Sequence, residues 1–426
     1  MRTTVLTLLA ATLAPLAPLA HASENTWSIY SELDLFAYSE VISIKEFADD
    51  FRGDLATGDN AQTQNRFEIG GTWGPWRLAY VDRFDYITEF TQDTAIIHQS
   101  NENDLPLINR EYDVFLGVER LRARGIKGGY NWQVNDTLSV RGDVTWYFDL
   151  RDLQSGFARA NGPLDPVTEQ LEADVNAFID TLDIDNRDLS PLRTLLADVD
   201  GSVEISYAYD EPKFDEPNYV QPVIFAPQPP PLTGVDFSAP GGDGYSIDLG
   251  VTWQATPQLR LDLDVTDAVN EFSWDNAPTT YATLDVGEAV NQLIDEAQLL
   301  VNSEVARPDD VIDDQLIVDI RNQDYTQKLS ERYSLRGRYD LANAINLFGW
   351  EATPAVVGQF YRTELHDFPR LGVGLNDNLE VMYDFGGDAL LVNFRTRWVY
   401  ARLIIDEFDA DKANTFGFQV GFNLGF

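Results

Sequence analysis

Polar and apolar residues alternate along much of this chain with a period of two. Between residues 138 and 150 the even positions are Leu138, Val140, Gly142, Val144, Trp146, Phe148 and Leu150, and the odd positions carry serine, arginine, aspartate, threonine or tyrosine. This pattern predicts a β-strand with one apolar face. A soluble sandwich would bury that face against a second sheet, but these strands approach a dozen residues, whereas soluble sheets usually use strands of about five or six.

The same pattern predicts an all-β antiparallel fold of about twelve strands, within a range of 12–14. The strands are expected at 27–38, 66–74, 76–88, 111–133, 137–151, 243–254, 258–273, 326–341, 354–365, 378–385, 389–402 and 415–426. Tight turns are expected at 74–75, 134–136, 255–258 and 386–388, and long connections at 39–65, 89–110, 152–242, 274–325, 366–377 and 403–414. Within 111–133 the arginines at 120, 122 and 124 could hide a further turn, which leaves the count open up to 14.

The C-terminal strand carries the most specific motif. Its even positions are all large and apolar, and the chain stops on an aromatic residue: Phe416, Phe418, Val420, Phe422, Leu424 and Phe426. The segment resembles the closing strand of Gram-negative outer-membrane β-barrels of the porin-like kind. The resemblance implies a transmembrane barrel in contact with outer-membrane lipids and lipopolysaccharide, and a terminal signal read by the barrel assembly machinery. Short periplasmic turns, long outer loops and an even strand count follow the same rule.

The N-terminus predicts export from the cytoplasm. Met1-Arg2 precedes an apolar run, and Ala20-His21-Ala22 has the small-x-small pattern of a cleavage site. A membrane anchor is the alternative, but Pro15 and Pro18 interrupt the run, which is shorter than a spanning helix needs. We therefore expect a signal peptide at 1–22 and an outer-membrane barrel at 23–426, with extracellular insertions at 152–242 and 274–325.

Both insertions are expected to contain a helix. Asp165-Pro166 begins apolar spacing that continues to Leu182, and a second apolar series runs from Val286 to Leu300. A proline-rich run follows the first helix between residues 212 and 231. Three roles are open: a lid or rim over the mouth, an inward plug, or a site that binds a partner outside the cell.

Polar faces of the strands predict a charged lumen. The candidate lumen residues are Glu32, Asp34, Arg141, Asp143, Arg260, Asp262, Asp264, Lys328, Arg332, Arg336, Arg338, Arg395 and Arg397. We expect the 258–273 and 326–341 strands to pair, which places an aspartate ladder beside an arginine ladder. Such ladders favour a narrow, selective pore for small polar or ionic solutes. The alternative is a narrow lumen filled by its own ion pairs.

Composition excludes several other functions. The chain has no cysteine, which removes disulfides, thiolate metal sites and cysteine nucleophiles. A formal charge of −40 argues against nucleic-acid binding. We expect no cofactor, no metal and no catalytic residues; the oligomeric state is not predicted. A hydrolase built on His366-Asp367 with Asp85 or Asp149 is the weakest alternative.

Overall fold

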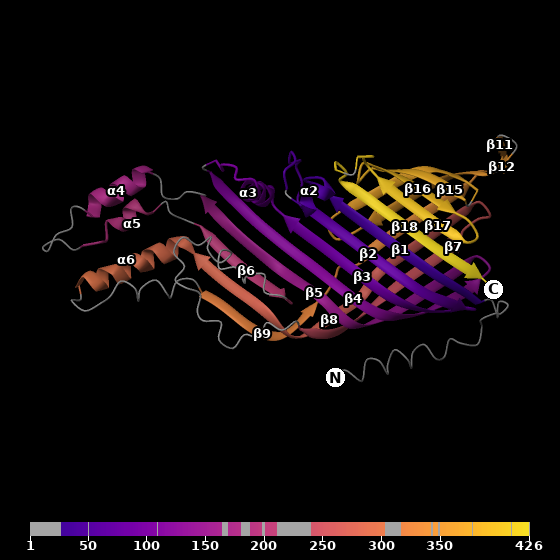
Figure 1. The fold of residues 1–426 in the computed structure, drawn as a ribbon, viewed down its shortest axis with the longest axis horizontal. Helices are drawn as coiled ribbons and strands as arrows, with labels where there is room; N and C mark the ends of the chain where they lie inside the picture. The colour runs from indigo at the N-terminus through magenta and orange to yellow at the C-terminus, as the bar shows by residue number, and fades with distance from the viewer. Residues whose placement is uncertain are drawn as a thin grey trace.

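The computed structural model is a closed barrel of fourteen antiparallel strands with a long extension at one end (Figure 1). It describes residues 27–49, 51–108, 110–163, 169–179, 188–197, 201–210, 240–302, 317–341, 344–347, 350–376, 378–409 and 411–425. Pairing of β1 with β18 closes the barrel, with Ser28 opposite Gly425. Both strand ends therefore lie at the same end of the barrel, which we call the turn end; the other is the extension end.

The strands are all antiparallel and follow one another around the barrel in chain order. The barrel strands are β1 (Trp27–Ser39), β2 (Asn60–Trp73), β3 (Trp76–Phe90), β4 (Glu111–Asn135), β5 (Leu138–Pro163), β7 (Gly241–Gln254), β8 (Leu259–Asp285), β10 (Arg332–Asp340), β13 (Pro354–Arg362), β14 (Asp367–Leu375), β15 (Leu379–Asp384), β16 (Ala389–Arg395), β17 (Val399–Ile405) and β18 (Thr415–Gly425). A small hairpin, β11 (Ile345–Leu347) and β12 (Trp350–Ala352), lies in the turn between β10 and β13.

The outer wall of the barrel carries an apolar belt. Large apolar side chains that remain exposed occur on every barrel strand, among them Ile29, Leu78, Leu249, Leu335, Val373 and Phe422. Aromatic pairs mark the turn end, where Trp27 stacks on Trp73 with ring centroids 5.5 Å apart. Exposed apolar side chains on every strand would be unfavourable in water, and this arrangement is typical of barrels that face lipid. No described helix is long and apolar enough to cross a membrane.

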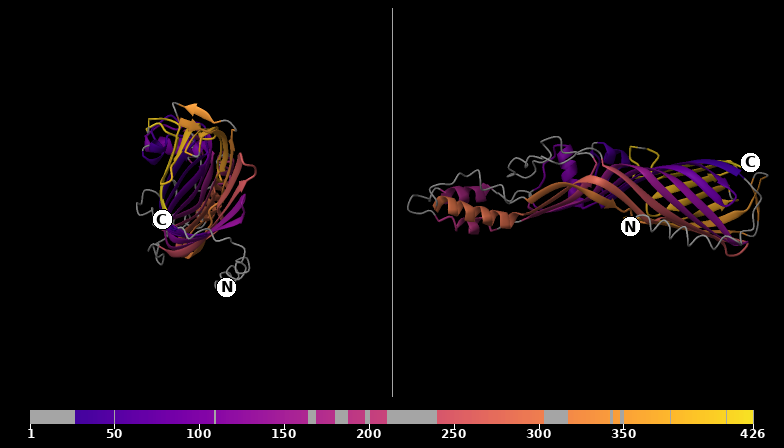
Figure 2. Two further views of the ribbon diagram at one scale, coloured as in Figure 1. Left: turned by 90° about the vertical axis from the view of Figure 1, so that its right-hand side faces the viewer. Right: turned by 90° about the horizontal axis from the view of Figure 1, so that it is seen from below.

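Three long strands continue beyond the barrel and form the extension. These are β4, β5 and β8, with 25, 26 and 27 residues. Two further strands join them: β6 (Ser202–Tyr209) fills the space between β5 and β8, and β9 (Ile317–Gln327) pairs with the other edge of β8. The helices α4 (Glu169–Ile179), α5 (Leu192–Leu195) and α6 (Val286–Asn302) lie together at the tip (Figures 1 and 2).

Bulges bend the long strands where the barrel passes into the extension. The β4–β5, β7–β8 and β8–β9 registers shift near Asp152, Asp267 and Asn276. All three residues have φ near +58°, a left-handed conformation that aspartate and asparagine tolerate better than most residues. Each extra residue changes the direction of the strand without ending it.

Two shorter helices follow β1 and β3 at the extension end of the barrel. α2 (Ile44–Ala48) and α3 (Gln92–Glu102) lie within the loops predicted at 39–65 and 89–110. Each begins at a hydroxyl N-cap, since Ser43 accepts from the Glu46 N–H and Thr91 from the Thr94 N–H. Their buried contacts include Val41, Ile42, Phe51, Ala61, Phe90 and Ala95.

The closed antiparallel barrel is confirmed, but the expected count of twelve strands is too low. Residues 366–377 were expected to form a long loop, and most of them form β14 instead. Pro369 and two glycines, at 372 and 374, resemble a loop in sequence. Gly372 is needed in the strand because an added Cβ would lie 2.0 Å from the Val381 carbonyl oxygen. The Gly386-Gly387 turn consequently lies at the extension end.

The predicted strand 389–402 is two strands, β16 and β17. A three-residue turn at 396–398 joins them, and the Thr396 hydroxyl accepts from the Trp398 and Val399 N–H groups at 3.2 and 3.0 Å. Outward side chains have even residue numbers on β16 and odd residue numbers on β17. Trp398, in the turn, is apolar and even-numbered, so in the sequence the even pattern continues through the turn without a visible break. The 111–133 segment contains no turn, and its irregularities are bulges.

Both predicted helices exist, and neither is a plug. The first predicted helix corresponds to α4, which is described from Glu169, so its predicted start at Asp165-Pro166 lies outside the described residues. The second corresponds to α6, which begins at Val286 as predicted. The Leu189 N–H donates to Gln298 at 2.5 Å, and Arg193 pairs with Asp295, which joins α5 to α6. Because these helices lie at the tip of the extension, away from the lumen, the inward-plug alternative is wrong (Figure 2). Residues 1–22, the 212–231 run and Phe426 lie outside the described residues.

Candidate functional site: a charged lumen

The inward positions of the barrel strands enclose a cavity of about 540 Å³ near the turn end. Its charged lining consists of nine arginines and five carboxylates among the described residues: Arg66, Arg83, Arg141, Arg260, Arg332, Arg336, Arg370, Arg395 and Arg402, with Asp34, Asp85, Asp262, Asp264 and Glu380. Alternation along the strands places them inside, and most of them are flanked by outward apolar or small residues. The chain as a whole is strongly acidic, so the surface of this cavity differs from the rest of the molecule.

The predicted charge ladders meet as expected. Arg336 on β10 lies opposite Asp262 on β8 in the register, and their side chains are 3.5 Å apart. Arg336 also pairs with Glu380. Arg141 on β5 reaches across β7 to Asp264 on β8 at 2.9 Å, and Arg260 contacts Asp262 on its own strand at 2.9 Å. The ladder therefore runs along the wall of the cavity and is half-exposed to it.

Most other predicted lumen residues also face inward. Asp34 and Arg395 line the cavity, and the Arg395 guanidinium lies 5.6 Å from the Tyr400 ring centroid. Glu32 accepts from the Gln419 amide at 2.6 Å. Two residues lie behind the cavity surface: Asp143 between Arg77 and Arg141, and Arg338, which pairs with Asp340 and Glu380 at 2.9 Å.

Two predicted lumen residues lie elsewhere. Lys328 is exposed in the link between β9 and β10, because the strand expected at 326–341 is interrupted there and the adjacent Gln327 is the buried one. Arg397 is exposed in the turn between β16 and β17, where its guanidinium lies 5.0 Å from the Trp398 ring centroid. Lys328 and Arg397 were assigned to the lumen from an alternation of polar and apolar residues that stops at the β9–β10 link and at the β16–β17 turn.

A buried network of two arginines and two aspartates lies deeper in the lumen. Arg83 donates to Asp85 at 2.7 Å and to both oxygens of Asp267 at 2.8 and 2.9 Å. Arg332 donates to Asp85 at 3.2 Å and to Asp267 at 2.8 Å. Only Arg332 of these four was predicted to face the lumen. Asp267 occupies an odd position in a strand whose inward positions are even, and the bulge turns it inward, which alternation could not predict.

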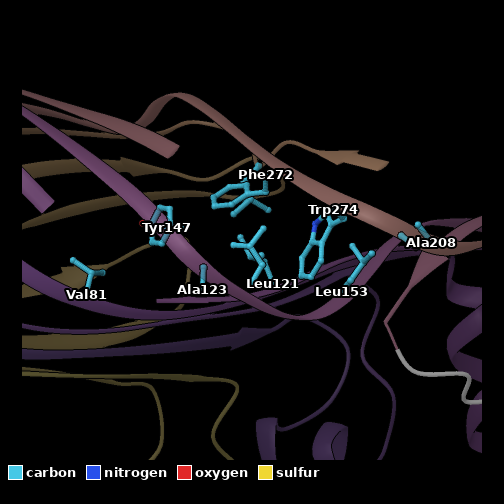
Figure 3. Close-up of a cluster of buried hydrophobic side chains, with 11 residues drawn as sticks. Val81, Leu121, Ala123, Tyr147, Leu153, Ala208, Phe272 and Trp274 are labelled. Carbon is cyan, nitrogen blue, oxygen red and sulfur yellow. The ribbon is translucent and has the colours of Figure 1, made fainter. Parts of the chain in front are cut away.

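Apolar side chains fill the lumen directly beyond this network. Figure 3 shows the cluster, in which Tyr147 and Phe272 lie over the Arg83 guanidinium, each with its ring centroid 5.8 Å away. The cluster contains Val81, Leu121, Ala123, Tyr147, Leu150, Leu153, Ala208, Phe272, Trp274, Ala277 and Leu329. Trp274 is 1 % exposed and lies inside the cluster, unlike the exposed Trp27, Trp73 and Trp76 of the outer wall. We call this cluster the apolar seal.

A polar pair limits the seal at the extension side. Glu119 on β4 accepts from the Ser155 hydroxyl at 2.7 Å and from the Gln327 amide at 2.8 Å. The Trp274 indole N–H donates to the same Gln327 side chain at 3.3 Å. These bonds join β4, β5, β8 and β9 across the interior of the extension, so the described side chains fill the space between its strands.

The residues of the hydrolase alternative are not brought together. His366 contacts Tyr38, Glu40 and the Gly386 carbonyl, with Nδ1 3.0 Å from Glu40. Asp367 pairs with Arg362. Asp85 belongs to the buried network, while Asp149 lies on the outer face of the wall.

Comparisons with known proteins find similarity only in structure. No family model matches the chain, and no curated protein matches its sequence. A deletion mutant of the monoaromatic hydrocarbon channel TodX aligns over 95 % of this chain and 90 % of its own, with 10 % identity and a TM-score of 0.34. The Pseudomonas putida toluene transporter TodX aligns over 98 % and 92 %, at 10 % identity and a TM-score of 0.31. A Pseudomonas aeruginosa FadL homologue aligns over 94 % and 90 %, at 9 % identity and a TM-score of 0.25.

Proposed function

We propose that this protein is an outer-membrane barrel that passes small polar or ionic solutes through a gated lumen, with a preference for anions. The observation that carries the proposal is the 540 Å³ cavity, whose lining holds nine arginines and five carboxylates in a chain of formal charge −40. Charged side chains that line a water-filled passage select ions by sign and orient polar solutes.

The apolar seal makes gating part of the proposal. Arg83, Asp85 and Asp267 have side chains no more than 4 % exposed, and the seal packs directly over them. A solute that enters from the extension end must displace these groups. We therefore expect low conductance in the resting state and brief openings, in contrast to a permanently open general porin.

A pathway for hydrocarbons, such as the aligned channels are named for, would need an apolar route. Here the apolar interior residues are packed against one another, and the open space is charged. Uptake of toluene is nevertheless a useful arm of the experiment, because it separates the two solute classes directly.

One observation favours a second candidate, a surface barrel whose function is attachment. The helices α4, α5 and α6 are held at the tip of the extension, far from the lumen (Figure 1). Replacement of residues 164–200 with a short glycine-serine linker would abolish attachment and leave conductance unchanged if the tip and the lumen act separately.

Planar-bilayer recordings under a salt gradient test the proposal. We expect single-channel events with a reversal potential that indicates anion preference. Arg395→Gln should reduce that preference, because Arg395 lines the cavity; Arg397→Gln is the matched control, because it lies two residues away and outside the cavity. Absence of conductance at every voltage, or permeability to toluene alone in vesicles, would overturn the proposal.

A further inference from the structure

Three arginines of β4 and β5 and two aspartates of β3 and β5 form a cluster on the outer face of the barrel wall. Its members are Arg122, Arg124 and Arg151, together with Asp82 and Asp149; we call it the arginine patch. Arg124 contacts Asp82 at 3.0 Å and Asp149 at 3.5 Å. Arg151 contacts Asp149 at 3.1 Å, and Arg122 lies 3.7 Å from Asp82. The side chains of Arg122 and Arg151 are 42 % and 56 % exposed.

The arginine patch lies at the edge of the apolar belt that faces the extension end. The outward positions nearer the turn end are exposed and apolar on the same strands: Leu78, Ile126, Val144, Trp146 and Phe148. The outward positions that follow toward the extension are Arg124 on β4, Asp149 on β5 and, after Tyr80, Asp82 on β3. A change from apolar to charged along the lipid-facing side of three neighbouring strands marks the level at which lipid headgroups begin.

The charges within the patch are not balanced. Arg122 and Arg151 lie directly opposite each other in the β4–β5 register. Like charges in that position repel, which favours a counter-anion between them. The three arginines share two aspartates, so the patch carries an excess of positive charge in a chain that is otherwise strongly acidic.

We propose that the arginine patch binds the phosphates of a phosphorylated glycolipid of the outer leaflet, that is, the lipid A part of lipopolysaccharide. Arginine donates to phosphate in a bidentate geometry, and exposed guanidinium groups beside a lipid-facing aromatic side chain suit a headgroup whose acyl chains continue along the wall. The inference rests on the outer-membrane placement in the proposed function, and it is independent of conduction.

Native mass spectrometry of the full-length barrel in detergent micelles tests this directly. The probes are bisphosphorylated lipid A, the same lipid after removal of its phosphates, and inorganic phosphate alone. We expect Arg122→Gln/Arg151→Gln to weaken binding of bisphosphorylated lipid A about tenfold, the size of effect expected for one or two lost charged hydrogen bonds. The dephosphorylated lipid should bind weakly to both proteins.

Arg321→Gln/Arg362→Gln is the matched control. Both arginines are similarly exposed and pair with an aspartate, Asp319 or Asp367, outside the patch. Retention of the heat-dependent gel shift shows that each variant is folded, and Arg151→Gln alone supplies a milder variant. Equal lipid A binding by the variant and the wild type would overturn the proposal. So would equal binding of dephosphorylated lipid, or occupation by inorganic phosphate with an affinity equal to that for the lipid.

Discussion

Removal of one charge from the buried network should destabilise the barrel strongly. Asp267 is 1 % exposed and accepts three hydrogen bonds, two from Arg83 and one from Arg332, all between 2.8 and 2.9 Å. Asp267→Asn keeps the shape, and asparagine tolerates the φ of +58° at this bulge. The change leaves two guanidinium groups with Asp85 as their remaining carboxylate in the network.

The expected loss is large because the charged side chains of the network are buried. Breaking a buried ion pair by removing one partner typically costs about 3–5 kcal/mol. Asp264→Asn is the control: its side chain is 45 % exposed and contacts the half-exposed Arg141, so the expected loss is about 0–1 kcal/mol. Both should shift the urea midpoint of refolding into detergent or lipid vesicles, followed by tryptophan fluorescence and the heat-dependent gel shift.

A second substitution tests the cause. Arg332→Gln in the Asp267→Asn background restores the balance of one arginine and one aspartate, Arg83 and Asp85. The double variant should therefore be more stable than Asp267→Asn alone. Two results would show that the network does not stabilise the lumen through its charges. One is an equal loss of stability in Asp267→Asn and Asp264→Asn. The other is a loss in the double variant equal to the sum of the losses of Asp267→Asn and Arg332→Gln measured separately.

Three other predictions follow from features of the extension and the wall. Burial raises the pKa of Glu119, which lies beyond the arginine patch and outside the apolar belt, to about 7; the folded state therefore holds a proton that the unfolded state has released, so stability falls as pH rises from about 4.5 to 7. Protection factors in the extension, which correct for the base-catalysed rise of intrinsic amide exchange with pH, should be lower at pH 8 than at pH 5, and Glu119→Gln should remove the difference; equal wild-type protection factors at the two pH values would contradict the argument. Trp274→Ala should cost about 3–5 kcal/mol and raise single-channel conductance, since it opens a void in the apolar seal; stability lost with conductance unchanged would show that the seal does not gate. Val373→Arg places a charge on the lipid-facing side of β14 and should cost about 2–4 kcal/mol in vesicles, whereas a neutral effect would argue that this position is not in lipid.

Alternation predicted the closed barrel and most of the lumen because the two faces of a strand meet different solvents. It succeeded wherever a strand is regular, as for Arg336 beside Asp262. It failed where the period changes. The Trp398 turn and the Lys328 link interrupt the pattern without a proline or glycine to mark them.

Asp267 shows the other limit of sequence reasoning. Its side chain reaches the lumen through a bulge, and bulges depend on how two strands pair, which one strand's sequence does not contain. The extension was likewise expected as loops, because β6 and β9 form only by pairing with the far ends of β5 and β8. Function of the predicted lumen residues, the C-terminal assembly signal and the cleaved leader stays a prediction.

The uninterrupted course of β5 and β8 has a mechanical consequence. Each strand begins at the turn end, passes beside the apolar seal and ends next to the helical tip. A pull on the tip along these strands would load their interstrand hydrogen bonds in shear, the direction in which many bonds resist together. The compliant points are the bulges at Asp152, Asp267 and Asn276, one of which holds the carboxylate at the centre of the buried network. A load applied at the tip would therefore reach the lumen at the Asp267 bulge, where it would act directly on the buried ion-pair network.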